Sequence, residues 1–215
     1  MDDFEEKWQK SQIEGWKNDG PEIVSFFNKY SLNIGDVYGH IVEIEYERMQ
    51  IICYLLSKIM RVMKICDFLD QLAETENDDV DVTKMFLLIS HAEITMNNFG
   101  YKGKKQNLVN LYFAPVEERY RLKYKIMVGI NSITDAGNLS FADILYKIRC
   151  EYVHEGNYTG RIFKLKGDGK CTLMIRFKHN KEDVFGECNV TYQEFMTIYM
   201  DALIENIKIY SNYGK

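Results

Sequence analysis

The chain has 215 residues, of which 46% are hydrophobic and 27% are charged, and its net charge is −5. This composition excludes an intrinsically disordered chain and fits a single globular domain with a buried core. The start, MDDFEEKW, is acidic where a targeting peptide would be basic, and the longest uncharged run near the apolar centre, 49–57, is far shorter than the ~20 residues of a membrane span. We therefore expect a cytoplasmic protein that spans no membrane.

Two prolines in the whole chain and many Leu, Ile and Met residues at helical spacing favour helices. The first segment predicts a helix of about 15 residues, a break at Gly20-Pro21 and a short helix that ends near Tyr30. We interpret residues 1–36 as an N-terminal helical lid. The large side chains of its first helix are Phe4, Trp8, Ile13 and Trp16.

A long helix is predicted from about Val37 to Ala73, because apolar residues recur there in alternating steps of three and four. Such a stripe indicates one helix face packed lengthwise against other helices. The stripe consists of Ile52, Leu55, Ile59, Val62, Cys66, Leu69 and Ala73.

The next segments predict a loop over 74–81, with Asp81 as the N-cap of a helix from Val82 to Asn98. Inside that apolar helix, His91 is predicted to be a hydrogen-bonded core residue. After a basic loop the pattern is poor as far as Pro115, and a helix is expected from about Val116 to Asn131.

Ser140 and Asp143 form a capping signal for a helix over 140–156, and the Thr191–Glu194 capping box opens the last helix. Between 161 and 190 the apolar period changes to two, which predicts a small β-meander. The predicted fold is therefore mainly α, an antiparallel helical bundle over 37–215 with a β-meander inserted before the last helix.

Basic residues are concentrated in one part of the chain: 101–181 holds 16 Lys or Arg and 7 Asp or Glu. Such a region can contact a phosphate backbone, although a solvated basic face is the plainer interpretation. The predicted β-meander has a cationic face suited to hold RNA. That face consists of Lys164, Lys166, Arg176 and Lys178.

The five cysteines include no Cys-x-x-Cys pair, and no histidine has the spacing of a metal ligand set. The sequence therefore predicts reduced thiols, no metal site and no cofactor.

Arg149 and His154 lie five positions apart in LYKIRCEYVHEGN, near the end of a predicted helix. In an ideal helix their side chains point about 140° apart and lie about 7.5 Å apart along the axis. Both can act on one phosphate if the helix loosens toward Gly156, or if two copies pair around a two-fold axis and build the sites at their interface.

This segment resembles the Arg-x-x-x-x-His motif of the HEPN superfamily (higher eukaryotes and prokaryotes nucleotide-binding), particularly its prokaryotic, Apea-like members that read Leu-Tyr-x-x-Arg…His-x-Gly. The resemblance covers roughly 37–212. It implies a metal-independent endoribonuclease that works as a homodimer, in a toxin or antiviral defence setting in which an antitoxin or another protein partner is also expected.

The resemblance further implies the roles of the two residues. His154 would be the general base or acid for attack of the ribose 2′-hydroxyl on the adjacent phosphate, and Arg149 would stabilise the charge on the phosphoryl oxygens. The products would be a 2′,3′-cyclic phosphate and a 5′-hydroxyl. The resemblance also allows a non-catalytic role, because many members of the superfamily are modules that bind RNA, a nucleotide or a protein partner. That interpretation stays open.

Other interpretations of these residues also stay open. On spacing alone, His154 complements the helix dipole and Arg149 is a surface ion-pair partner of Glu151 or Asp143. Cys150 and His154, four apart, allow a thiolate nucleophile. Tyr158, like Tyr146 and Tyr152, is either a stacking platform for RNA bases or a packing residue.

Overall fold

The computed structural model describes residues 3–30, 34–73, 80–120, 140–155, 174–179, 182–187 and 191–214. The described part is mainly helical, as the sequence predicts. Its elements in chain order are α1 (Asp3–Asn28), α2 (Gly35–Ile41), α3 (Tyr46–Ala73), α4 (Val80–Asn98), α5 (Lys105–Tyr120), α6 (Phe141–Glu155), β1 (Met174–His179), β2 (Glu182–Glu187) and α7 (Tyr192–Ser211).

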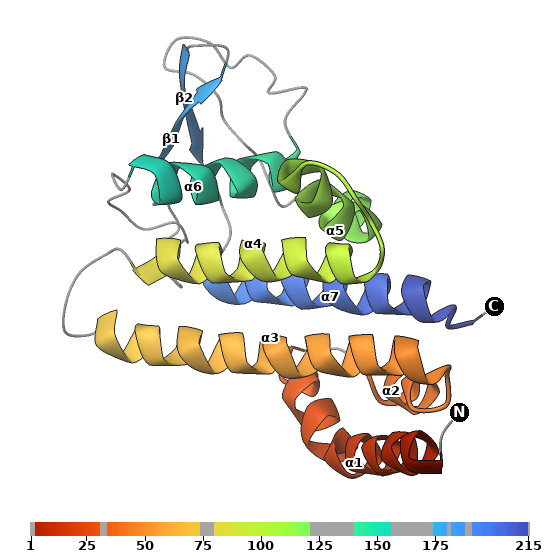
Figure 1. Cartoon of the computed structure of the whole chain (residues 1–215). Helices are drawn as coiled ribbons and strands as arrows, with labels where there is room; N and C mark the ends of the chain where they lie inside the picture. Colours follow the sequence, from red (N-terminus) through yellow and green to blue (C-terminus); the bar gives the residue numbers. More distant parts are fainter. Residues whose placement is uncertain are drawn as a thin grey trace.

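The helices form a bundle in which α3, α4 and α7 lie lengthwise next to one another (Figure 1). α3 runs antiparallel to both α4 and α7. α5 and α6 cover one side of this layer, while α1 and α2 cover the other (Figure 1). No helix among the described residues has an apolar stretch long enough to cross a membrane.

The predicted stripe on α3 is a core face over most of its length: Ile52, Leu55, Ile59 and Cys66 are fully buried, and Val62 and Leu69 are half-buried. The side chain of Ala73 lies outside the described part of the structure. The predicted start of this helix at Val37 is wrong, because a turn over 42–45 separates α2 from α3. α2 buries its own apolar residues at positions 37, 38 and 41. The turn lets the apolar face of α2 and the apolar face of α3 both pack into the core, which one straight helix would not achieve.

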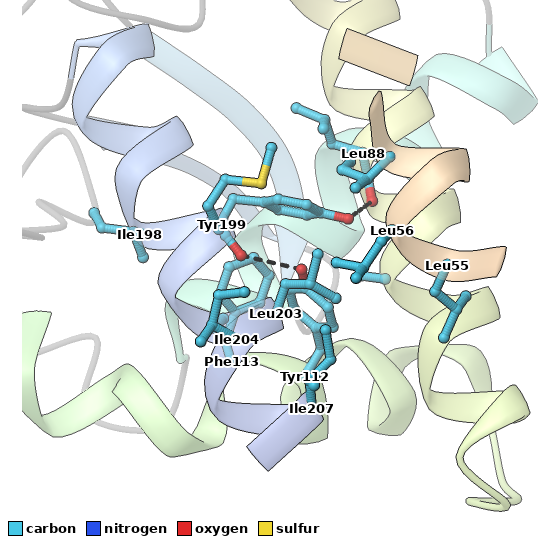
Figure 2. Close-up of a cluster of buried hydrophobic side chains, with 14 of the residues drawn as sticks. Leu55, Leu56, Leu88, Tyr112, Phe113, Ile198, Tyr199, Leu203, Ile204 and Ile207 are labelled. Atoms are coloured by element: carbon cyan, nitrogen blue, oxygen red, sulfur yellow. Dashed lines mark hydrogen bonds between the residues drawn. The ribbon is translucent and has the colours of Figure 1, made fainter. Parts of the chain in front are cut away.

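α7 closes the core: Met196, Met200, Leu203 and Ile207 are buried on one face of the helix, and Tyr210 at its end is half-buried. Figure 2 shows Tyr199 at the centre of this packing. The Tyr199 hydroxyl donates to the Leu88 carbonyl oxygen at 2.9 Å, and the Tyr112 hydroxyl donates to the Tyr199 carbonyl oxygen at 3.0 Å (Figure 2). These hydrogen bonds connect α7 to α4 and α5 inside the core.

His91 is a hydrogen-bonded core residue, which confirms the prediction. It is 1% exposed, its Nδ1 lies 2.7 Å from the Tyr199 hydroxyl oxygen, and its Nε2 lies 3.3 Å from the Leu55 carbonyl oxygen. Burial lowers the His91 pKa to about 4, although the Leu55 carbonyl favours the charged ring.

The predicted break at Gly20-Pro21 is wrong, since α1 continues through both residues. The helix is bent (Figure 1), as expected where proline removes a backbone donor. Tyr38 of α2 packs on the bend: its hydroxyl donates to the Trp16 carbonyl oxygen at 2.7 Å, and a Cβ on Gly20 would lie 2.8 Å from its ring. Tertiary packing at Gly20 therefore stabilises the helix where the local sequence favours a break.

Two other helix starts differ from the prediction. α4 begins at Val80, so Asp81 is not the N-cap but lies in the first turn, where its carboxylate is 3.1 Å from Lys84 Nζ. α5 begins at Lys105 and contains Pro115, whereas the sequence predicts a helix only from Val116. The helical spacing of its buried residues, at 108, 109, 112, 113 and 116, explains why the helix forms there.

The described residues contain no β-meander; between 161 and 190 they form one antiparallel pair, β1 and β2. The predicted first strand, which carries Lys164 and Lys166, lies outside the described residues. The predicted border between lid and main domain, at residue 36, falls inside α2.

Candidate active site around Arg149

α6 carries both motif residues, and its N-terminus is fixed by a capping box. The Asp143 backbone N–H donates to Ser140 Oγ, and the Ser140 N–H donates to the Asp143 carboxylate, each at 3.0 Å. Gln106 and Asn110 of α5 donate to the same carboxylate at 2.7 and 2.9 Å. Burial alone would raise the Asp143 pKa, but these hydrogen bonds outweigh it and the pKa is lowered. An ionised anchor thus joins α6 to α5.

Arg149 does not extend into open solvent. Its side chain is 11% exposed, and its Nε lies 3.5 Å from Oε1 of Glu93, a residue of α4 that is 8% exposed. The two atoms are buried and form no hydrogen bond, so they make an ion pair only. Asp143, the neighbour on the same helix, is bound to α5 instead.

Two aromatic rings lie close to the Arg149 guanidinium. Its Cζ lies 5.7 Å from the ring centre of Phe86 on α4 and 5.9 Å from that of Tyr146 on α6. Both distances are within the range of cation–π attraction. The guanidinium is therefore held between two helices by one carboxylate and two rings.

Burial and nearby positive charges act in opposite directions on the pKa of Glu93. Burial raises the Glu93 pKa, the nearby charges of Arg149 and Lys105 lower it, and the net direction is upward. The ion pair therefore offsets the burial of this carboxylate only in part. Next to it, burial and the hydrogen bond to Cys150 raise the Tyr146 pKa to about 12, so this phenol is neutral at physiological pH.

His154 lies on the same helix, in the last turn of α6, which is helical through Glu155. Its side chain is outside the described part of the structure. Because the backbone is helical at both motif positions, the divergence of about 140° and the axial separation of about 7.5 Å apply. Loosening of the helix before Gly156, one of the two ways to bring the residues together, does not occur in the described residues.

The residues predicted to hold RNA fall in and around the β pair. Lys164, Lys166 and Tyr158 lie outside the described residues. Arg176 and Lys178 are on β1, and the register pairs Lys178 with Asp183. The side chains of both strands lie outside the described part of the structure, so the cationic face stays a prediction.

Glu93 and Phe86 are site residues that the sequence argument does not identify. The sequence does hold one indication of the role of Glu93, which is the only acidic residue in the apolar stretch 85–96. A carboxylate in such a stretch needs a partner, because a buried unpaired charge is costly. Within the described residues no group of three or more His, Cys, Asp or Glu could hold a metal ion.

No family model, curated protein or solved structure matches the chain, so these comparisons do not assign it to a family. The functional argument therefore rests on the arrangement of residues around Arg149 and on the motif.

Proposed function

We propose that this chain is a metal-independent endoribonuclease of the HEPN type, in which Arg149 and His154 form the active site. The observation that carries the proposal is the support around Arg149. A solvated surface arginine needs no buried carboxylate and no flanking rings, whereas a residue that stabilises a transition state must be held in place.

The chemistry follows from the two residue types. His154 removes the proton from a ribose 2′-hydroxyl, the 2′-oxygen forms a bond to the adjacent phosphorus, and the bond from phosphorus to the 5′-oxygen breaks. The imidazolium formed in this way then gives its proton to the leaving 5′-oxygen. Arg149 donates hydrogen bonds to the phosphoryl oxygens as their charge grows. The products are a 2′,3′-cyclic phosphate and a 5′-hydroxyl.

The helical backbone of α6 favours a site shared between two copies. With about 140° between the two side-chain directions, one chain does not direct both at one phosphate. Two copies related by a two-fold axis can place Arg149 of one next to His154 of the other. A homodimer with composite sites is therefore part of the proposal.

Single and mixed variants test this function. We expect Arg149→Ala and His154→Ala proteins each to cleave RNA at least about 100-fold more slowly than wild type in EDTA. Mixing the two inactive variants should restore activity, because the mixed dimer holds one composite site with both residues intact. A wild-type rate in either variant would exclude this site, and a mixture as inactive as its parts would exclude the shared one.

A second candidate function is a non-catalytic HEPN module that binds RNA, a nucleotide or a protein partner. In this candidate the Arg149–Glu93 ion pair is only structural, and the excess of basic residues over 101–181 supplies the contact to RNA. It predicts salt-sensitive RNA binding without cleavage by the wild-type chain. Where RNA is the ligand, we propose that Lys164, Lys166, Arg176 and Lys178 hold its backbone; reversing these four charges should abolish binding.

A further inference from the structure

Glu93 stands out among the buried acids because its ion pair connects α4 to a residue of the motif. It is 8% exposed, and its neighbours on α4, Ile89, Ala92 and Met96, belong to the apolar core. Removing a carboxylate from water costs several kcal/mol unless a partner compensates. The partner that the described residues give it is Arg149, so the two side chains depend on each other.

Among the described residues, the contact to Glu93 uses the Nε edge of the Arg149 guanidinium and not its Nη edge. An arginine has five N–H donors, one on Nε and four on the two Nη atoms. Glu93 approaches the Nε edge, at 3.5 Å and without hydrogen-bond geometry. A bidentate contact to a phosphate uses parallel N–H groups and does not require the Nε donor that faces Glu93.

Phe86 and Tyr146 restrict the same guanidinium further. Their ring centres lie 5.7 and 5.9 Å from Cζ, so the group is held by contacts from α4 and α6 together. A long arginine side chain loses much rotamer entropy when it binds a ligand. If that entropy is lost on folding instead, the interaction with the transition state is correspondingly stronger.

We propose that Glu93 is a positioning residue of this site: it holds the Nε edge of Arg149 between the Phe86 and Tyr146 rings, so that the other edge is directed at the scissile phosphate. The inference rests on the proposed ribonuclease function and adds a residue that the motif does not contain. Glu93 acts through Arg149 and touches no reacting atom.

The test compares Glu93→Gln, which keeps the shape and removes the charge, with wild type on RNA in EDTA. We expect kcat to fall about 10- to 100-fold while KM changes less than about two-fold, because a misplaced guanidinium weakens the transition state more than the bound substrate. Glu93→Asp, which keeps the charge on a shorter side chain, should give a kcat between those of wild type and Glu93→Gln. In an Arg149→Ala background, Glu93→Gln should cause no further loss.

A matched control separates positioning from general stability. Asp201 is as buried as Glu93, at 8% exposed, and pairs with Arg119 on another part of the bundle. We expect Asp201→Asn to lower the melting temperature as Glu93→Gln does and to leave kcat unchanged in an assay well below that temperature. The control shows whether removing the charge of a buried, ion-paired carboxylate alone changes the rate.

The outcomes distinguish this inference from the proposed function. A folded wild-type chain that cleaves no RNA removes the proposed function, and the role of Glu93 with it. Cleavage that needs Arg149 but proceeds at the wild-type kcat in Glu93→Gln overturns only the positioning role. Should Glu93→Gln fail to fold, Glu93→Asp decides: full wild-type kcat overturns the proposal, and a loss of three-fold or more at unchanged KM supports it.

Discussion

Lowering the pH should destabilise the fold through His91. The ring is 1% exposed beside Tyr199, the charge of Lys58 adds to the effect of burial, and the folded-state pKa is about 4 against an ordinary value of 6.5. The unfolded chain therefore takes up a proton first as the pH falls. Stability is complete above pH 6.5 and decreases between pH 6.5 and 4.

The pKa difference sets the magnitude. A shift from 6.5 to about 4 corresponds to about 3 kcal/mol in the free energy of unfolding once the pH is below 4, and about 2 kcal/mol of it is already lost at pH 5. His91→Gln removes the titrating ring while keeping a donor and an acceptor. We expect it to be less stable than wild type at pH 8, because a buried hydrogen-bonded group is replaced.

Urea unfolding at pH 8 and pH 5, followed by circular dichroism, measures this effect. Between the two pH values the wild type should lose about 2 kcal/mol more than His91→Gln, since all other titrating groups are shared. An equal loss in both proteins would show that His91 is not held neutral by the core, and the argument from burial would then be wrong.

Two further predictions concern packing and capping. Gly20→Ala should lower the free energy of unfolding by about 1–3 kcal/mol, because its Cβ would lie 2.8 Å from the Tyr38 ring. Gly15→Ala in the same helix meets nothing within 4 Å and should raise the free energy of unfolding by up to about 1 kcal/mol. Equal urea concentrations at the midpoint of unfolding in these two variants would contradict the close contact between Gly20 and Tyr38. Thr191→Ala removes the acceptor of the Glu194 N–H and should cost about 1 kcal/mol, which lowers the melting temperature by about 2–4 °C; an unchanged temperature would contradict the cap.

Features that depend on neighbouring residues were predictable from the sequence. The stripe on α3 is buried because its spacing alone sets which face is apolar. The caps at Ser140 and Thr191 form within three residues of chain, so the motif contains all the groups that it needs.

Features that depend on distant residues were not predictable. Gly20 and Pro21 read as a helix break because the packing of Tyr38 against them is set by tertiary structure. The start of α5 is a different case: its apolar residues at 108, 109, 112, 113 and 116 have helical spacing, but Pro115 inside the helix disfavoured a helix before Val116.

The residues of the candidate site also fall into those that the sequence identifies and those that only tertiary packing brings there. The motif identifies Arg149 and His154 because they are close in sequence, and it predicts how far apart they point. It contains no information on Glu93, whose connection to Arg149 exists only because α4 and α6 pack together. Spacing alone suggested an ion pair within the helix of Arg149, whereas the structure places one between helices.

The most direct test of the central claim is the chemistry of the RNA ends. The purified chain is incubated with mixed RNA in EDTA, and the fragments are analysed for their terminal groups. Cleavage through Arg149 and His154 predicts 2′,3′-cyclic phosphate and 5′-hydroxyl ends from wild type and intact RNA from His154→Ala. RNA left intact by the folded wild-type chain, or the same ends from His154→Ala, would contradict the claim.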